Sequence, residues 1–182
     1  SNVKNINKDL EIDLKKIKIT LRPLKFKLNL KTIGAKLIIN NKKIEIENIQ
    51  TQISIISYLN NSFSLENFEI SSKSLEIKNL ISFIREFHNT PQLYILEKVI
   101  KKGYLITDIR LNFNEKGEIL DDFTIDGFIK DAKLNFLKNK KIEKLDFIFN
   151  LNNERFLAKN LNFKVNNLNF LSDDLVIKKK RE

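Results

Sequence analysis

The feature that most constrains the fold is an alternation of apolar and polar residues along most of the 182-residue chain. Successive side chains of a β-strand point to opposite faces, so apolar residues at every second position share one face. The segment from Leu24 to Leu30 is typical, because Lys25, Lys27 and Asn29 separate its apolar residues. The sequence therefore predicts a mainly β fold: an elongated, curved antiparallel sheet, with strands in about half the residues or more.

Pairs of asparagine separate several of these alternating runs, and the chain has only four glycines. Asparagine tolerates the left-handed backbone conformation that tight hairpin turns require, so the pairs predict up-and-down hairpins. A one-residue slip in the alternation at Lys15-Lys16 is typical of a β-bulge. The expected turns are Asn40-Asn41, Asn60-Asn61, Glu115–Gly117, Lys138–Lys141, Asn152-Asn153 and Asn166-Asn167.

Residues 79–102 break the alternation, because their apolar residues follow a helical spacing. Thr90-Pro91 is typical of a helix cap followed by proline at the first helical position, and Gly103 of the residue after a helix. We expect two helices, at about 79–88 and 91–102, inserted between two β halves and covering part of the sheet. Their expected buried faces are Leu80, Phe83, Ile84 and Phe87, then Ile95, Val99 and Ile100.

The residue inventory argues against enzyme chemistry. His88 is the only histidine, no cysteine is present, and no orienting acid or nucleophile can be assigned to His88 as a partner. The acid pairs Asp121-Asp122 and Asp173-Asp174 suit turns, since adjacent strand residues point to opposite faces. The sequence lacks a glycine-rich phosphate loop, an EF-hand pattern and metal-spaced His/Cys sets. We expect a non-enzyme with no cofactor and no metal site.

The formal charge of +10 raises the possibility of nucleic-acid binding. A nucleic-acid binder concentrates its cations on one face together with aromatic residues that stack on bases. Here the lysines are spread along every strand, and the phenylalanines are in phase with isoleucine and leucine. The charge therefore indicates a solvated face, and we expect no nucleic-acid partner; steep salt-dependent affinity for DNA or RNA would contradict this.

The apolar face leaves two architectures open. Either a second sheet seals it, which gives a structural or scaffolding β-domain without a ligand, or one curved sheet forms an open apolar trough. A trough would dissolve acyl chains, at about 0.8 kcal/mol for each methylene removed from water. The residues expected to line it are Phe26, Leu28, Leu37, Ile39, Leu111, Phe113, Phe147, Phe149 and Phe163.

The order of segments in this chain resembles the AsmA-like superfamily of bacterial envelope proteins. The stretches that carry the resemblance are Ile53–Leu59, Phe63–Ile70 and Leu75–Leu80, followed by the helical pair and Gly103, then Leu105–Phe113, Phe123–Ile129, Ile142–Phe147 and Leu161–Val165. The likeness covers about residues 45–180; the superfamily includes TamB and YhdP, and the second stretch, from the helical pair onward, resembles the domain found in YhdP-type members. Those members carry more glycine within their strands than this chain does.

The resemblance implies a long β-groove in the periplasm. It also implies an inner-membrane anchor outside this chain, passive phospholipid transport toward the outer membrane in support of outer-membrane biogenesis, and no catalytic residues. On this interpretation residues 1–182 are a single β-groove segment of a longer protein, and phospholipid acyl chains are its main partners.

Overall fold

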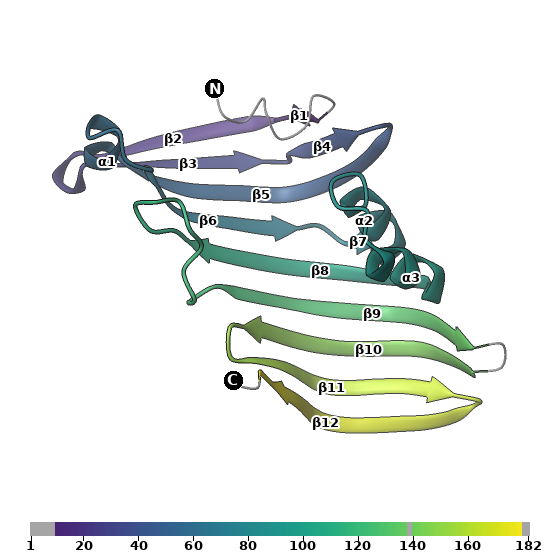
Figure 1. Ribbon diagram of the computed structural model, residues 1–182. Helices are drawn as coiled ribbons and strands as arrows, with labels where there is room; N and C mark the ends of the chain where they lie inside the picture. The colour runs from purple at the N-terminus through teal and green to yellow at the C-terminus, as the bar shows by residue number, and fades with distance from the viewer. Residues whose placement is uncertain (1–9, 138–139, 180–182) are drawn as a thin grey trace.

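Within the residues that the structure describes, the chain folds into one curved, open antiparallel sheet of twelve strands (Figure 1). The structure is a computed structural model that describes residues 10–137 and 140–179. Strands account for 64% of the described residues, and the helices among them are few and short. The predicted fold class is therefore confirmed.

The strands follow one another along the chain, interrupted by short helices at three places. The helical segments are a 3-10 turn η2 (Pro23–Lys25), α1 (Ile55–Leu59), α2 (Ile77–Ile84) and α3 (Pro91–Val99). The strands are β1 (Glu11–Asp13), β2 (Lys16–Arg22), β3 (Lys27–Ile33), β4 (Lys36–Ile39), β5 (Lys42–Ser54), β6 (Leu65–Ser72), β7 (Leu75–Glu76), β8 (Ile100–Asn112), β9 (Thr124–Leu137), β10 (Lys140–Asn152), β11 (Arg155–Val165) and β12 (Leu168–Lys178).

The topology is an up-and-down meander, as the asparagine pairs predict. Every pairing between strands is antiparallel, and chain neighbours pair from β8 through to β12. On the N-terminal side, β1 and β2 pair with β4 and β3, which both pair with β5. β3 and β4 together therefore occupy the place of one long, interrupted strand beside β5, and β1 and β2 together occupy the place of another beside them.

Most of the predicted turns are present. Asn40, Asn41, Asn166 and Asn167 all have positive φ values, so both asparagines of each pair adopt the left-handed conformation of a tight hairpin. The expected turn at 138–141 falls largely on residues 138–139, which lie outside the described residues.

The helical region differs in detail from the sequence expectation. Thr90 caps α3 as predicted, since its side-chain oxygen accepts a hydrogen bond from the N–H of Leu93 (3.4 Å). However, α3 ends at Val99, and Gly103 lies within β8 with φ +140° instead of following a helix. Ile84 and Ile95, expected on buried helix faces, are exposed.

Helix α1 was not predicted. The alternation of Ile53 and Ile55 favours a longer strand, but β5 ends at Ser54, whose hydroxyl caps α1 by accepting from the N–H of Ser57 (3.1 Å). A serine cap is a strong helix-start signal that competes with the β-branched residues after it.

The fully buried core is concentrated under α2 and α3. One cluster joins Phe83 of α2 to buried residues of β4 and β5, including Ile39 and Ile44. A second cluster joins Ile77 and Ile81 of α2 to residues of β8 and β9. The helices therefore cover one end of one face of the sheet (Figure 1).

The rest of that face has no second layer within the described residues. The chain's accessible surface is 13170 Å², whereas a compact protein of 21.4 kDa exposes about 9,100 Å². The excess is what a single sheet gives when no opposing sheet or helix layer covers it. The sheet is therefore open, not one half of a sandwich within this chain.

Candidate functional site

The strand registers place the apolar residues of neighbouring strands on one common face. Residues directly opposite each other in an antiparallel pair project to the same side, and Leu28 pairs with Ile53, as Phe68 does with Leu111. We call this side the apolar face. Its main residues along the middle of the sheet are Leu28, Leu30, Ile49, Ile53, Phe68, Ile70, Leu105, Ile109, Leu111, Ile125, Ile129, Leu145, Phe147, Phe149, Leu151 and Phe156.

One-residue irregularities interrupt several strands and keep the apolar residues on this face. In β9 the alternation shifts from odd to even positions at Asp131, and in β11 it shifts back at Asn160. Both residues, and Lys144 of β10, have φ near +50°, and the β9–β10 and β10–β11 registers shift between residues 142 and 148. Such bulges turn one extra residue out of the ladder and bend the strand.

The same shift occurs on the N-terminal side of the sheet. Gly34, with φ +67°, separates β3 from β4, and its N–H donates to the carbonyl of Glu47 in β5 (2.7 Å). The β5–β6 register shifts at this point, between Ile46 and Asn48. These interruptions cross the sheet from strand to strand and give the long strands their curvature (Figure 1).

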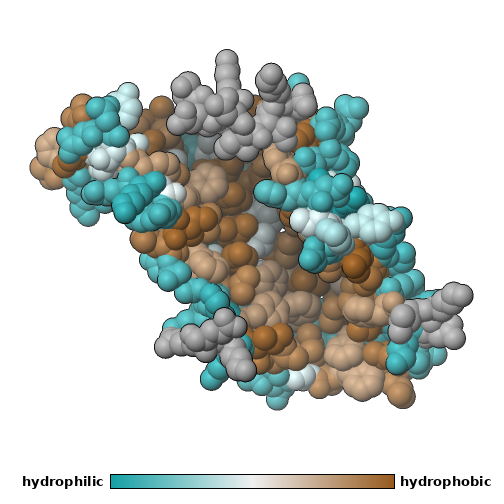
Figure 2. All heavy atoms as spheres, viewed as in Figure 1, coloured by the Kyte–Doolittle hydropathy of each residue, from teal (hydrophilic) through white to brown (hydrophobic). Residues whose placement is uncertain are grey.

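The apolar face is only half-covered outside the helical region. Its large side chains in β5, β6 and β8 to β11 are of intermediate burial, and those of the edge strands β2 and β12 are exposed. Figure 2 shows these apolar atoms as a broad, hollowed surface between the helices and the opposite end of the sheet. An uncovered apolar surface of this extent marks a binding surface or an interface.

An aromatic cluster lies in the middle of the face. The rings of Phe147, Phe149 and Phe156 lie 6.0 to 6.5 Å apart, with Phe149 stacked on Phe156. Gly127 of β9 faces Phe149 across the strand pair, and a Cβ at Gly127 would lie 2.4 Å from the Phe149 ring. The glycine therefore lets the ring lie flat against the sheet, which makes the surface smooth at this point.

The predicted lining residues divide into three groups. Leu28, Leu111, Phe147 and Phe149 lie on the uncovered apolar face. Phe163 lies on the same face in β11 and stacks on Phe170 of the edge strand, with ring centres 5.2 Å apart. These five residues therefore lie on the part of the apolar face that the helices do not cover.

The other four lie at the ends of the sheet. Leu37 and Ile39 are beneath α2, where Ile39 is only 1% exposed and belongs to the core. Phe26 follows the 3-10 turn between β2 and β3, and Phe113 contacts Phe63 beyond the end of β8, with ring centres 5.7 Å apart. The lining residues predicted from the sequence did not include Ile53, Phe68, Ile109, Ile125 and Phe156, which the same alternation places on the apolar face once the registers are known.

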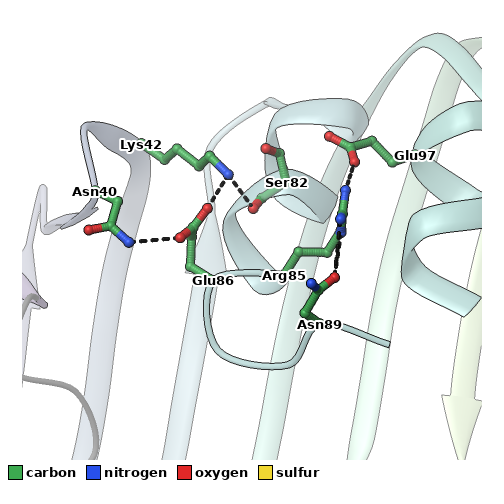
Figure 3. Close-up of polar contacts among 7 residues, drawn as sticks. All are labelled: Asn40, Lys42, Ser82, Arg85, Glu86, Asn89 and Glu97. Carbon is green, nitrogen blue, oxygen red and sulfur yellow. Dashed lines mark hydrogen bonds and ion pairs between the residues drawn. The ribbon is translucent and has the colours of Figure 1, made fainter. Parts of the chain in front are cut away.

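Helices α2 and α3 together form the helical cover, and polar contacts join them to each other and to the start of β5 (Figure 3). Lys42 of β5 pairs with Glu86 just after α2 and also donates to the carbonyl of Ser82 (3.1 Å). Asn40 donates to the same carboxylate (2.7 Å), and Arg85 pairs with Glu97 of α3. The hydrogen bond from Lys42, followed by that from Asn40, lowers the pKa of Glu86 below its usual 4.5.

The opposite face of the sheet carries both signs of charge beside a smaller apolar patch, in which Ile106, Phe128 and Ile148 are cross-strand neighbours. Arg110 of β8 pairs with Glu69 of β6 (3.2 Å), and Lys27 pairs with Glu66 (2.7 Å). Glu45 lies between Lys43 and Lys73, whose hydrogen bonds lower its pKa from 4.5 to about 2. A shallow depression on this side is lined mainly by polar and charged residues, among them Arg22, Gln50 and Gln52.

The described residues supply few groups for chemistry. No cluster of three or more histidine, cysteine or acidic residues suited to a metal ion occurs within residues 10–137 and 140–179. His88 is exposed, and its N–H donates to the carbonyl of Ile84 (3.0 Å). No helix in the same ranges has the length and apolar character needed to cross a bilayer.

Comparisons with known proteins leave this face as the main guide to function. No protein-family model, no curated protein and no solved structure matches the chain.

Proposed function

We propose that the chain is a non-enzymatic lipid-binding segment whose apolar face holds phospholipid acyl chains and lets them pass along it. The proposal follows the AsmA-like resemblance. We propose that the chain lies in the periplasm, that its protein is anchored through a segment outside this chain, and that it lets phospholipid move passively between inner and outer membrane. Envelope proteins could be further partners.

The uncovered apolar face is the observation that carries the proposal. Partly buried side chains such as Ile53, Phe68 and Phe147 continue from strand to strand without an opposing layer in the described chain. Each methylene that leaves water for such a surface gains about 0.8 kcal/mol, so an acyl chain is a fitting occupant. An open trough leaves the headgroup in water, which makes headgroup recognition unnecessary.

The length of the strands suits an acyl chain. Strand β8 has 13 residues, and a strand rises about 3.3 Å per residue, so a full strand extends for about 40 Å. The helical cover occupies one end, and the remaining apolar face continues to the end that carries α1 (Figure 1). An extended acyl chain can therefore lie along the uncovered part.

The test compares three aspartate variants of β10. Phe147→Asp and Phe149→Asp place a charge on the apolar face, whereas Ile148→Asp places the same charge on the opposite face of the same strand, where Ile148 is exposed. A charge in an apolar channel is costly to desolvate. Lipid bound to the purified proteins is measured by native mass spectrometry, with folding followed by circular dichroism.

We expect the wild type and Ile148→Asp to carry phospholipid, and both phenylalanine variants to be folded but lipid-free. A wild type that never carries lipid, or a loss equal in all three variants, contradicts the proposal.

A structural, ligand-free β-domain is the second candidate, and the sealed core under α2 favours it. There the apolar face already behaves as a conventional core, with Ile39 and Phe83 almost fully buried. If another sheet covers the remainder, the purified protein should be a lipid-free oligomer. Sedimentation velocity separates the two: lipid-free oligomers support the structural candidate, and monomers with bound lipid support the trough.

A further inference from the structure

The end of the sheet opposite the helical cover carries a cluster of exposed apolar side chains. Leu24 in the 3-10 turn η2 is 97% exposed, and Tyr58 and Leu59 at the end of α1 are 69% and 71% exposed. Phe26 and Ile56 beside them are also exposed. We call these five residues the apolar tip. Single exposed apolar residues are common, but five on two adjoining connections form a patch that water covers poorly.

The backbone holds the two parts of the tip together. The N–H of Ile55, at the start of α1, donates to the carbonyl of Phe26 (2.8 Å). Phe26 has φ +49°, and its N–H donates back to the carbonyl of Pro23 (3.1 Å), which closes the turn that presents Leu24. Figure 1 shows this turn and α1 side by side at one end of the sheet, projecting beyond the strands. The tip is therefore a built feature of the fold.

The hairpin that carries the tip is strongly basic. The β2–β3 hairpin, residues 16–33, contains six lysine or arginine residues and no acid. Lys25 and Lys27 directly flank Leu24 and Phe26, Arg22 lies two residues before Leu24, and Lys27 pairs with Glu66 (2.7 Å). Exposed apolar side chains with neighbouring cations match the interfacial layer of an anionic bilayer, which takes up apolar groups and attracts basic residues.

We propose that the apolar tip inserts into the interfacial layer of a lipid bilayer, with a preference for anionic lipid. The exposure and charge of the tip carry this inference. Its meaning for lipid entry rests on the proposed function: the uncovered part of the apolar face runs toward the tip, so insertion brings the open end of the trough to the membrane.

The acidic loop between β8 and β9 sets the orientation of this contact. The loop lies next to α1, since the N–H of Phe63 donates to the carbonyl of Glu115 (3.1 Å). It carries Glu118, Asp121 and Asp122, which an anionic surface repels. The molecule should therefore approach with its β2–β3 side leading, and apolar insertion should contribute more to binding than charge does.

The experiment measures binding to vesicles by flotation, with phosphatidylcholine alone and with added phosphatidylglycerol. Leu24→Asp removes the most exposed apolar group of the tip and adds a charge. Leu171→Asp is its matched control, because Leu171 is also a leucine, is 79% exposed, and lies in β12 at the far edge of the sheet. Lys25→Glu tests the electrostatic part. Circular dichroism checks that each variant is folded.

We expect Leu24→Asp to lower vesicle affinity about tenfold or more, which is the loss of one buried leucine. Lys25→Glu should lower affinity several-fold for the anionic vesicles only, and Leu171→Asp should match the wild type. The proposal is overturned if the wild type does not float with either vesicle, or if Leu24→Asp and Leu171→Asp lose the same affinity. It is also overturned if Leu24→Asp abolishes self-association while vesicle binding is absent, because the tip is then a protein contact.

A second measurement separates this proposal from the proposed function. Uptake of a soluble fluorescent fatty acid reports on the apolar face, and Leu24→Asp should leave it unchanged. Vesicle binding without fatty-acid uptake would support the tip and count against the trough. Fatty-acid uptake without vesicle binding would do the reverse.

Discussion

Adding a single methyl group at Gly127 tests how the middle of the apolar face is built. The φ of Gly127 is not positive, so alanine meets no backbone strain there, and its effect reports on contacts alone. The new Cβ would lie 2.4 Å from Cζ of Phe149 and 2.9 Å from the carbonyl oxygen of Ile106. The Phe149 ring must therefore move, and the stacking on Phe156 must change with it.

The expected cost follows from overpacking. Extra methylene groups in packed sites destabilise by about 1–3 kcal/mol, and a half-exposed ring that can shift toward solvent favours the lower part of this range. For a chain of this length about 1 kcal/mol corresponds to roughly 2–4 °C in Tm. Gly127→Ala should therefore lower the Tm by a few degrees, with the strand content of the circular-dichroism spectrum unchanged.

A double-mutant cycle assigns this loss to the ring. Gly127→Ala in the Phe149→Ala background should cost less than in the wild type, with a coupling of about 0.5–2 kcal/mol in urea unfolding. Relief should be partial, because the Ile106 carbonyl still opposes the methyl group. Phe163→Ala is the matched control, since Phe163 stacks on Phe170 instead, and its effect should add to that of Gly127→Ala. A neutral Gly127→Ala, or additivity with Phe149→Ala, refutes the reasoning.

Two further predictions concern the helical cover. Phe83→Ala should cost about 3–5 kcal/mol in urea unfolding because Phe83 is buried in the core, whereas Ile84→Ala should cost about 1 kcal/mol or less because Ile84 is exposed. Equal losses of unfolding free energy in the two variants would show that α2 does not pack against the sheet through Phe83. The lowered pKa of Glu86 stabilises the fold above the unfolded value of 4.5, and this contribution is lost as pH falls through the lower folded pKa. Below pH 4.5 the wild type should therefore lose more stability than Glu86→Gln, and parallel acid profiles would contradict the pairing with Lys42.

The sequence was sufficient for the local structure wherever one pattern stood alone. The alternation predicted strands, and Asn40-Asn41 and Asn166-Asn167 predicted hairpin turns that the positive φ values confirm. Prediction was wrong where two signals competed. At Ile53–Ile55 the alternation predicted a continuing strand, whereas the Ser54 cap starts a helix there. At Gly103 the glycine predicted a helix end, whereas it lies at a bulge inside β8. Glycine serves both purposes, because both use positive φ.

The covering of the apolar face could not be predicted from the sequence. A strand with one apolar face gives the same alternation whether that face meets a second sheet, a helix or an open space. Thus Ile39 and Phe147 looked equivalent, yet α2 buries the first and leaves the second half-exposed. The helical spacing of residues 79–102 predicted a cover, but which strands lie under it depends on the registers of β4, β5 and β8.

The alignment of the bulges is a property of the whole sheet. Each slip is visible in the sequence as a one-residue change of phase, as at Asp131 and Asn160, and alone it would turn the following apolar residues toward the opposite face. Slips in neighbouring strands compensate one another: Leu145 still pairs with Ala132, and Phe149 with Ala158. The apolar face is therefore continuous across the bend, and the irregularities that curve the sheet are also those that keep this face unbroken along it.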